Sequence, residues 1–284
     1  MSWTGHGKDR PPDAMGPALP RAGRMLRMPL LRWREVLAPP VLAMQFLSAV
    51  PLPLSVPAET RHFGRALACF PLAGALLGLA LAGLDVVLLR FLPVPVATVL
   101  VLAGGVLLTG GLHLDGLMDT CDGVFGGRTA ERRLEIMRDS RVGSYGALAG
   151  ALALLLKYAG LAALPVALRG PALVLLPVAG RWAMAGCAWA FPYARPQGLG
   201  TAFKAGATWR VMLVATALAA GLAWATLGMA GLAFLGTAAV LAWVVAWYLA
   251  GKLGGLTGDC YGAVNEAVEA GLLVTLAAWA GTAP

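Results

Sequence analysis

The stretch FPLAGALLGLALAGLDVVLLRF, residues 70–91, decides the fold class. Only Asp85 and Arg90 interrupt its apolar character, and about 20 apolar residues let a helix cross the hydrocarbon core of a bilayer. The rest of the chain is similar: 59% of its 284 residues are hydrophobic, 13% are charged, and the mean hydropathy is +0.75. Soluble domains carry about 25% charged residues. The sequence therefore predicts an all-α, polytopic transmembrane helix bundle.

Apolar segments of spanning length occur seven times along the chain. Prolines and glycines mark the breaks between them, such as Pro93 with Pro95 and Gly170 with Pro171. Residues 36–57 are also apolar, but prolines interrupt them, so we expect a re-entrant or interfacial segment packed against the bundle. The seven expected spans are 65–91, 94–112, 147–166, 171–191, 211–229, 231–250 and 264–283.

The first 35 residues form a different kind of segment. They hold seven of the 22 Lys and Arg residues and several prolines, without an apolar run of signal-peptide length. We interpret 1–35 as a basic, disordered cytosolic tail and 36–284 as one integral-membrane domain. No folded basic module accompanies the tail, which argues against nucleic-acid binding. Met25 and Met28 are alternative starts that the sequence does not separate from Met1.

The basic residues also predict an orientation. With the tail in the cytosol, seven spans place 113–146, 192–210 and 251–263 in the cytosol, together with the remaining Lys and Arg of the loops. The opposite side receives only Arg90 and Arg169. This distribution follows the positive-inside rule. We therefore expect a multi-pass inner-membrane protein whose active site faces the cytosol.

The segment from Gly110 to Gly146 carries most of the chemistry. Asp115, Asp119 and Asp122 are spaced i, i+4 and i+7, which places them on one stripe of a helix. Carboxylates stacked in this way repel one another, and oxygen ligands of this kind suit Mg²⁺. A solvated acidic face is the alternative. The leucines around the aspartates favour the metal, because ionisable groups close to the membrane are usually functional.

Arginines and one histidine accompany these aspartates. Several guanidinium groups beside a carboxylate-held Mg²⁺ are typical of a diphosphate site, although topology alone explains Arg132 and Arg133 equally well. Asp139 is either a fourth metal ligand or a residue that orients a neighbouring arginine. His113 is either a general base or a hydrogen-bonded group behind the reacting residues.

A second segment, GGLTGDCYGAVNEAVE, spans residues 254–269. Its carboxylates Asp259, Glu266 and Glu269 stand where an apolar helix enters the membrane, and they are costly there unless they are paired. A metal, Lys252, or Arg181 and Lys157 are the candidate partners. A substrate-binding or metal-supporting role is favoured over a structural ion network.

Further strings complete the pattern: FLSAVPLP (46–53), FPLAGALLG (70–78) and RLEIMRDSRVGSYG (133–146). With them, the chain from about residue 40 to its end resembles the cobalamin synthase family, the adenosylcobinamide-GDP ribazoletransferases. Family members usually carry an acidic residue where Leu114 stands, which argues against a required ligand at that position.

The resemblance implies an inner-membrane, Mg²⁺-dependent transferase. Such an enzyme joins α-ribazole, or α-ribazole 5′-phosphate, to adenosylcobinamide-GDP, releasing GMP and forming adenosylcobalamin or its 5′-phosphate. We expect the ribazole 5′-oxygen to attack the phosphorus attached to cobinamide. The expected site comprises Asp115, Asp119, Asp122 and Asp139 for Mg²⁺; His113, Arg138, Arg141 and Glu266 for catalysis; and Arg128, Arg132, Lys252, Asp259 and Glu269 for substrate binding.

Other functions fit parts of the pattern. A CDP-alcohol phosphotransferase or an aromatic prenyltransferase would also place aspartates beside Mg²⁺ and a diphosphate, but a prenyltransferase usually has two similar aspartate-rich repeats. A cation-coupled transporter would explain Asp85 and Lys157 within the spans, yet the chain lacks repeated halves. The preferred form of ribazole and the oligomeric state, a homo-oligomer included, stay open.

Overall fold

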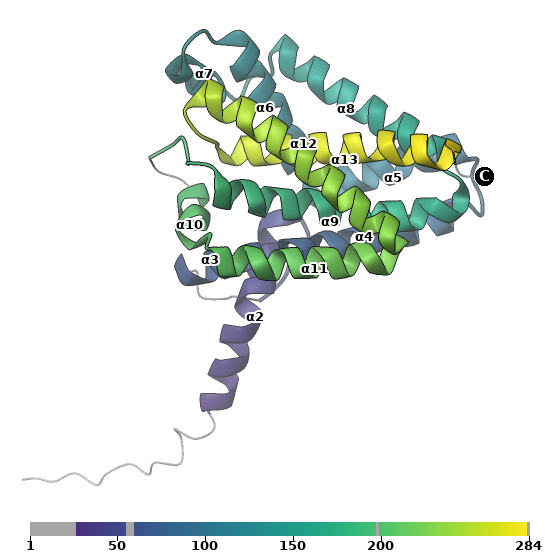
Figure 1. Cartoon of the computed structure of the whole chain (residues 1–284), viewed down its shortest axis with the longest axis horizontal. Coiled ribbons are helices and arrows are strands. Elements are labelled where there is room, and N and C mark those ends of the chain that lie inside the picture. Colours follow the sequence, from purple (N-terminus) through teal and green to yellow (C-terminus); the bar gives the residue numbers. More distant parts are fainter. Residues whose placement is uncertain (1–26, 55–59, 197–198, 283–284) are drawn as a thin grey trace, which may run out of the picture. The chain divides into compact units, whose positions relative to one another are not determined.

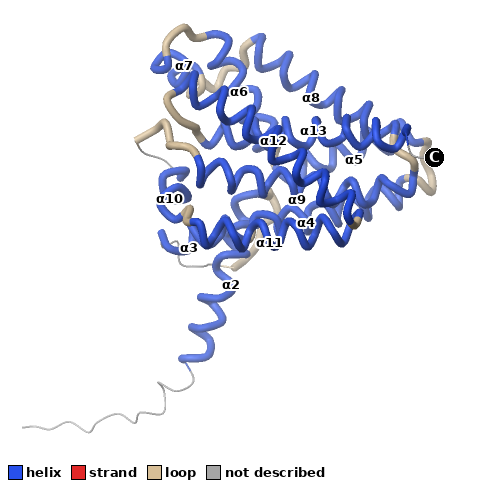
Figure 2. Tube along the Cα trace, in the orientation of Figure 1, coloured by secondary structure: helices blue, strands red, loops and turns tan. Residues whose placement is uncertain are grey.

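The computed structural model describes residues 27–54, 60–196 and 199–282 of the chain. This part consists of twelve helices, α2 to α13, and contains no named strand (Figure 2). Residues 1–36 and 37–284 form two units. Of the first unit only the beginning of α2 (Arg27–Leu47) is described, so the expected tail lies largely outside the described residues, and its last part, from Arg27, is helical.

Six helices of the second unit are long and apolar enough to cross a membrane, and Figure 1 shows them running alongside one another. At about 1.5 Å per residue they match a hydrocarbon core of about 30 Å. The expected fold class is thereby confirmed. The six are α4 (Phe70–Leu88), α8 (Ser144–Ala163), α9 (Val166–Ala190), α11 (Trp209–Leu227), α12 (Met229–Leu253) and α13 (Gly258–Thr282).

The seventh expected span, 94–112, is a bent pair. Helix α5 (Val94–Thr109) ends at Gly110, and α6 (Leu112–Gly126) leaves at 87° to it. Gly110 and Gly111 have φ angles of 61° and 72°, in the left-handed region that glycine adopts without a steric penalty. Helix α6 therefore turns away from the direction of the spans, and it carries the aspartate motif with it.

Three span boundaries differ from expectation by five residues or more. The last span, α13, begins at Gly258 and not at residue 264. The first span begins at Phe70, because α3 (Thr60–Ala68) is a separate helix. The break between α8 and α9 lies at Leu164 and Pro165, not at Gly170 and Pro171. Leu164 is extended, as the residue before a proline prefers. Pro171 lies inside α9 instead.

The proline-rich segment 36–57 is helical as far as Leu47. Pro39 and Pro40 lie within α2 and do not end it. Its apolar part, Val36–Leu47, is too short to span a membrane, as expected. Its placement at the interface stays a prediction.

Helix α9 is the most buried of the spanning helices, and α4 packs closely along it. A Cβ atom on Gly74 would lie 2.3 Å from the Pro177 carbonyl oxygen, and one on Gly78 would lie 2.5 Å from that of Leu173. Small residues four apart allow such backbone contact between membrane helices. Pro177 also lacks the N–H that would bond to the Leu173 carbonyl. The contact between α4 and α9 therefore depends on Gly74 and Gly78, which let the two helix backbones approach closely.

A buried ion pair ties the same two helices together elsewhere. The Arg169 guanidinium donates to both Asp85 oxygens at 2.9 and 2.5 Å, and also to Thr98 and to the Leu161 carbonyl. Arg169 is fully buried. Arg169 lies in the first turn of α9, near a span end as expected, and it is also part of the buried core.

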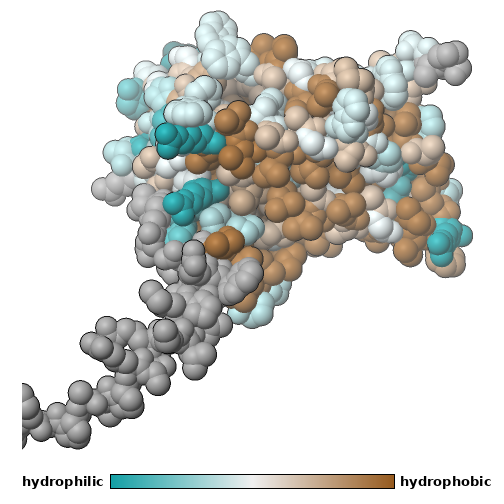
Figure 3. Space-filling model, turned by 60° about the horizontal axis from the view of Figure 1, so that its bottom comes forward, coloured by the Kyte–Doolittle hydropathy of each residue, from teal (hydrophilic) through white to brown (hydrophobic). Residues whose placement is uncertain are grey.

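The polar elements gather at one end of the bundle. Figure 1 shows α3, α6, α7 (Ala130–Ile136) and α10 (Leu199–Gly206) at the end opposite to the last turn of α13. Figure 3 shows a broad hydrophobic face along the helices, with hydrophilic residues towards the two ends. Exposed apolar side chains such as Leu79, Leu107 and Val240 belong on such a lipid-facing surface.

Candidate active site

Helices α6 and α13 bring the two motif segments into direct contact. A Cβ atom on Gly116 would lie 2.8 Å from the Asp259 carbonyl oxygen, and one on Gly262 would lie 3.0 Å from that of His113. Glycine at both positions lets the two backbones meet. The aspartate motif and the start of α13 therefore form one site, as expected from the sequence.

A loop pairing adds Arg195 to this site. Ala194 donates its N–H to the Leu256 carbonyl and Leu256 donates to the Pro192 carbonyl, both at 2.8 Å. The loop after α9 is thereby fixed to the loop before α13. Arg195 Nη2 then lies 2.9 Å from Asp259 Oδ2. In the sequence, Arg195 contributes only to the predicted orientation, because its partner Asp259 is 64 residues away along the chain.

Asp115, Asp119 and Asp259, with Arg195, form what we call the edge cluster. Asp119 shows their electrostatic coupling: partial burial and the charges of Asp115, Asp259 and Asp122 raise its pKa to about 6, against the opposing effect of Arg195. Among the described residues, no three His, Cys, Asp or Glu side chains converge closely enough to enclose a metal ion. With three carboxylates and one guanidinium, the cluster holds more negative charge than Arg195 compensates.

Asp122 has a structural partner that the sequence did not indicate. Its two oxygens accept hydrogen bonds from the N–H groups of Gly143 and Gly146, each at 2.8 Å, at the start of α8. A carboxylate at a helix N-terminus satisfies free N–H groups and interacts favourably with the positive end of the helix dipole. A Cβ atom on either glycine would lie 2.3 Å from Asp122. Asp122 therefore caps α8, and each oxygen retains an acceptor position for a further ligand.

Asp139 pairs with Arg141. Arg141 Nη2 lies 2.6 Å from Asp139 Oδ2, and these hydrogen bonds lower the Asp139 pKa to about 2. Of the two roles expected for Asp139, the geometry matches the one that orients an arginine. The pair lines a cavity of about 380 Å³ together with Asp122 and Arg132.

The remaining basic candidates lie in α7, in the loops beside it and at the end of α12. Arg128 and Arg138 are exposed, and Arg132 pairs with Glu135 at 2.7 Å. Lys252 lies over the Tyr248 ring at 5.4 Å. Arg133, for which topology alone was an equally good explanation, donates to the carbonyls of Gly127 and Lys252 at 3.0 and 2.9 Å, and so ties α7 to α12.

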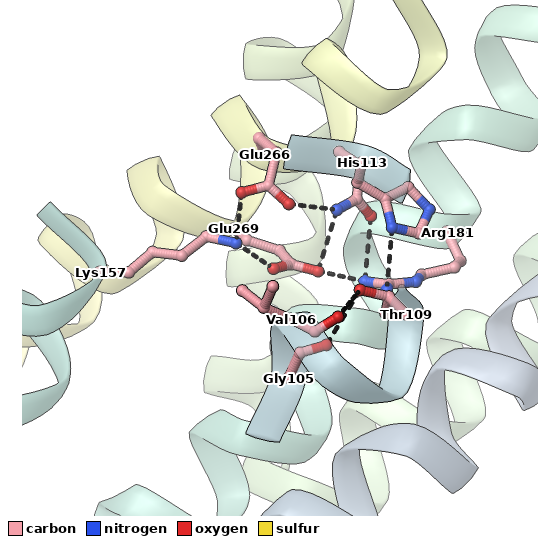
Figure 4. Close-up of polar contacts among 9 residues, drawn as sticks. Gly105, Val106, Thr109, His113, Lys157, Arg181, Glu266 and Glu269 are labelled. Carbon is pink, nitrogen blue, oxygen red and sulfur yellow. Dashed lines mark hydrogen bonds and ion pairs between the residues drawn. The ribbon is translucent and has the colours of Figure 1, made fainter. Parts of the chain in front are cut away.

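A second group of charges lies deeper, between α8, α9 and α13. Lys157 Nζ lies 2.7 Å from Glu266 and 2.6 Å from Glu269 (Figure 4). Arg181 pairs with Glu269 and donates to the Asn265 side chain at 3.1 Å. We call these five residues the inner network.

The inner network changes the interpretation of its two glutamates. Glu266 was expected to be catalytic and Glu269 to bind substrate, but both are nearly buried and paired with cations. The cavity beside them is only about 80 Å³. The geometry therefore matches the structural ion network that the sequence made the less favoured alternative, and it confirms Lys157 and Arg181 as the partners.

His113 lies between the two groups. Its Nδ1 is 3.4 Å from Arg181 Nη2, and Figure 4 shows the other ring nitrogen pointing away from that guanidinium. Nε2 has no hydrogen-bond partner within the described part of the chain. His113 also lines a cavity of about 210 Å³ together with Asp115 and Asp259.

Comparison with known proteins relates this geometry to a family. The sequence profile described as cobalamin-5-phosphate synthase matches residues 40–277. A protein named adenosylcobinamide-GDP ribazoletransferase from Desulforamulus reducens is 41% identical over 80% of this chain and 91% of its own. Proteins of the same name from Geotalea daltonii (39% identity; 84% and 96% covered) and Klebsiella pneumoniae (42%; 83% and 96%) are similar. No solved structure matches the chain.

Proposed function

Because the chain belongs to the cobalamin-5-phosphate synthase family, and is thus a membrane transferase of cobalamin biosynthesis, we propose that it joins ribazole to adenosylcobinamide-GDP and releases GMP. The observation that carries the proposal is the meeting of α6 and α13 at an edge where Asp115, Asp119 and Asp259 are electrostatically coupled and Arg195 pairs with Asp259. Phosphoryl transfer requires charge neutralisation and alignment more than covalent help from the protein.

Two cavities meet at this edge, which suits a reaction of two substrates. Asp115 lines both the cavity of about 210 Å³ and an open cavity of about 600 Å³ beside Gly110 and Gly111. A ribose hydroxyl of the acceptor attacks the phosphorus attached to cobinamide. The new O–P bond forms as the bridging P–O bond of the diphosphate breaks, and GMP leaves.

The expected attack by the 5′-oxygen of ribazole does not agree with the description of the family. The family description names cobalamin-5-phosphate as the product, and a product that keeps its phosphate on the 5′-oxygen was not made through that oxygen. The acceptor must react through another ribose hydroxyl. Ribazole and its 5′-phosphate can then use one mechanism, since neither needs a free 5′-oxygen.

Mg²⁺ is the proposed cofactor, and the donor chemistry of the edge cluster supports it. Mg²⁺ in diphosphate sites is usually held by one or two carboxylates, waters and substrate phosphates, so a closed protein cage is not required. One or two of Asp115, Asp119 and Asp259 would hold it, and Asp122 retains acceptor positions nearby. When bound, the ion neutralises charge on the diphosphate.

The arginines and His113 complete the proposed assignment. Arg141, oriented by Asp139, and Arg138 bind phosphate oxygens of the GDP moiety and stabilise the departing GMP. Arg128, Arg132 and Lys252 extend this positive surface for the donor. A carboxylate of the edge cluster takes the hydroxyl proton. Arg181 donates to Nδ1 of His113, so the neutral ring carries its proton on Nε2, and His113 is the hydrogen-bonded group behind the reacting residues. Glu269 holds Arg181, and through it His113, in position, while Glu266 pairs with Lys157.

We place this site on the cytosolic side of the inner membrane, on the support of the basic residues at the same end of the bundle. In a cysteine-free background, Ser140→Cys should react with a membrane-impermeant thiol reagent only in inverted vesicles. Phe91→Cys, at a side chain that is 79% exposed, should react only in right-side-out vesicles. The reverse pattern would contradict the orientation.

The reaction itself is tested by product release. Purified protein, ribazole, adenosylcobinamide-GDP and Mg²⁺ should give GMP and the cobalamin product in equal amounts. Omitting ribazole, or adding EDTA, should stop GMP release. GMP formation no faster than in the control without ribazole would reject the proposed function.

A further inference from the structure

Arg195 is a charged residue that the expected site did not include, and the loop that carries it is fixed by backbone contacts. A Cβ atom on Gly255 would lie 2.8 Å from the Pro192 carbonyl oxygen and 3.0 Å from the Ala194 nitrogen. Glycine at this position therefore permits the two loops to pair, with the Ala194 N–H bonded to the Leu256 carbonyl. The fold thus sets the position of Arg195 beside α13 without the help of a ligand.

The guanidinium of Arg195 has donors to spare. Nη2 donates to Asp259 Oδ2 at 2.9 Å, and the Thr257 hydroxyl donates to the same oxygen at 3.3 Å, so this arm of the guanidinium is held in place. Nε is enclosed and has no acceptor among the described residues. Nη1 also has no acceptor in the described part of the chain, but it is not enclosed, and the side chain is 17% exposed. Nη1 is therefore the donor that Arg195 presents to a ligand.

The other arginines of the proposed site lie at a different cavity. Arg141 pairs with Asp139, and both line the cavity of about 380 Å³ that Asp122 also lines. Among the described residues, Arg195 is the only Lys or Arg that pairs with a carboxylate of the edge cluster. Its charge also acts on Asp119, since it opposes the rise in the Asp119 pKa. A phosphate held beside the edge cluster therefore meets Arg195.

We propose that Arg195 is a catalytic residue, whose Nη1 donates to a nonbridging oxygen of the phosphoryl group attached to cobinamide. The assignment rests on the proposed function. A carboxylate of the edge cluster takes the hydroxyl proton, so the phosphorus under attack lies beside the same cluster. The new O–P bond forms, the bridging P–O bond breaks, and GMP leaves with its electron pair, while Arg195 keeps its proton. A guanidinium fixed in advance stabilises the charge of this transition state without reorganising.

Arg195→Ala tests the contact with substrate. Turnover should fall by about 100- to 1,000-fold, the effect of removing one preorganised donor. The half-saturating Mg²⁺ concentration should not rise, because the edge cluster becomes more negative and attracts a cation more strongly. An arginine that only compensates Asp259 would be replaceable by Mg²⁺. Turnover of Arg195→Ala equal to that of the parent at saturating Mg²⁺ would therefore overturn the proposal.

Nucleotide binding tests which phosphate Arg195 contacts. GDP carries both phosphates of the donor, whereas GMP carries only the one that leaves. Equilibrium binding of GDP in the presence of Mg²⁺ should weaken at least about tenfold in Arg195→Ala, the value of one charge-assisted hydrogen bond, and binding of GMP should not change. Unchanged binding of GDP, or equal weakening for both nucleotides, would overturn the assignment.

Two further variants serve as controls. Arg195→Lys keeps the charge but replaces the planar fork, so its ammonium cannot serve Asp259 and the phosphate in the same way, and turnover should stay at least about tenfold below the parent. This variant decides if Arg195→Ala does not fold, and full turnover would overturn the proposal. Arg210→Ala removes an arginine that lies over the Trp209 ring in the first turn of α11. It should behave as the parent, and a loss equal to that of Arg195→Ala would show a general effect of surface charge and overturn the proposal.

The outcomes separate this inference from the proposed function. A parent protein that releases no GMP would reject the proposed function itself. A parent protein that releases GMP, together with an equally active Arg195→Ala, would reject only the catalytic role of Arg195.

Discussion

The edge cluster and the inner network are both groups of charged residues on α13 and its neighbours, and they balance charge in opposite ways. The inner network sets Glu266 and Glu269 against Lys157 and Arg181, so each carboxylate has a cation. The edge cluster sets three carboxylates against Arg195.

This difference separates structural from reactive carboxylates. A buried carboxylate is tolerated when it is paired, and removing its partner is costly. A cluster with surplus negative charge is complete only when a cation from outside joins it. Depth and charge balance together, more than the residue type, indicate which acidic residues act on substrate.

The largest expected effect is at the edge cluster. Asp119→Asn should lower turnover by about 1,000-fold or more, because the charge of the transition state loses a preorganised partner. Its melting temperature without Mg²⁺ at pH 7 should not fall and should rise slightly. A carboxyl pKa raised from 3.8 to about 6 means that ionisation opposes folding, increasingly as the pH rises from about 4 to above 6.

The control for this variant is Asp119→Glu, which keeps the charge. It should retain more activity than Asp119→Asn and lack the gain in stability. Near-normal turnover in Asp119→Asn would mean that the edge cluster is a solvated acidic surface. The edge cluster and the inner network would then not differ as reactive and structural carboxylates.

The inner network should respond in stability. Glu269→Gln leaves Arg181 without its carboxylate at depth, which should lower the free energy of unfolding by about 3–5 kcal/mol. Unfolding in detergent measures this loss, and turnover per folded molecule should change far less than in Asp119→Asn. A stable variant with no turnover would place Glu269 in the reaction itself.

Glu266→Gln should have a smaller effect of the same kind. Lys157 keeps Glu269 at 2.6 Å, so the lysine stays paired, and the loss should be about 1–3 kcal/mol. Melting temperature and turnover per folded molecule are measured on the same preparation. Strong loss of turnover at unchanged stability would restore the catalytic role that the sequence suggested for Glu266.

The smallest effect is a pH dependence of the Mg²⁺ requirement. Protons compete with the ion for Asp119, so the half-saturating Mg²⁺ concentration should rise up to about tenfold per unit as the pH falls below about 6. Mg²⁺ titrations of turnover at constant ionic strength measure this. A requirement that does not change between pH 5.5 and pH 7.5 would show that Asp119 does not hold the ion.

Local sequence was sufficient for the elements of the bundle. Apolar runs predicted the six spans, and the spacing of Asp115 and Asp119 predicted a shared helix face. The bend after α5 could also have been inferred, since Gly110 and Gly111 are adjacent. The helix through Pro39 and Pro40 could not, because it depends on packing of residues such as Leu42 and Leu47.

The pairing of charges required the fold. Asp122 bonds to Gly143 and Gly146, and their role at α8 is visible only when the two segments meet. The sequence suggested Lys157 and Arg181 as candidate partners of the glutamates, but it did not show that each glutamate pairs with its own cation. Arg195 reaches Asp259 only through a loop pairing that no periodicity encodes.

The pair of Asp85 and Arg169 has a consequence for biosynthesis. The two residues are 84 positions apart, so at about 5–20 residues per second the ribosome needs about 4 to 17 s to supply the arginine after the aspartate. During that interval Asp85 of α4 has no counter-charge. The glycine face of α4 against Leu173 and Pro177 is equally unpartnered. We therefore expect α4 to be stably inserted only once α9 has emerged and Arg169 can pair with Asp85.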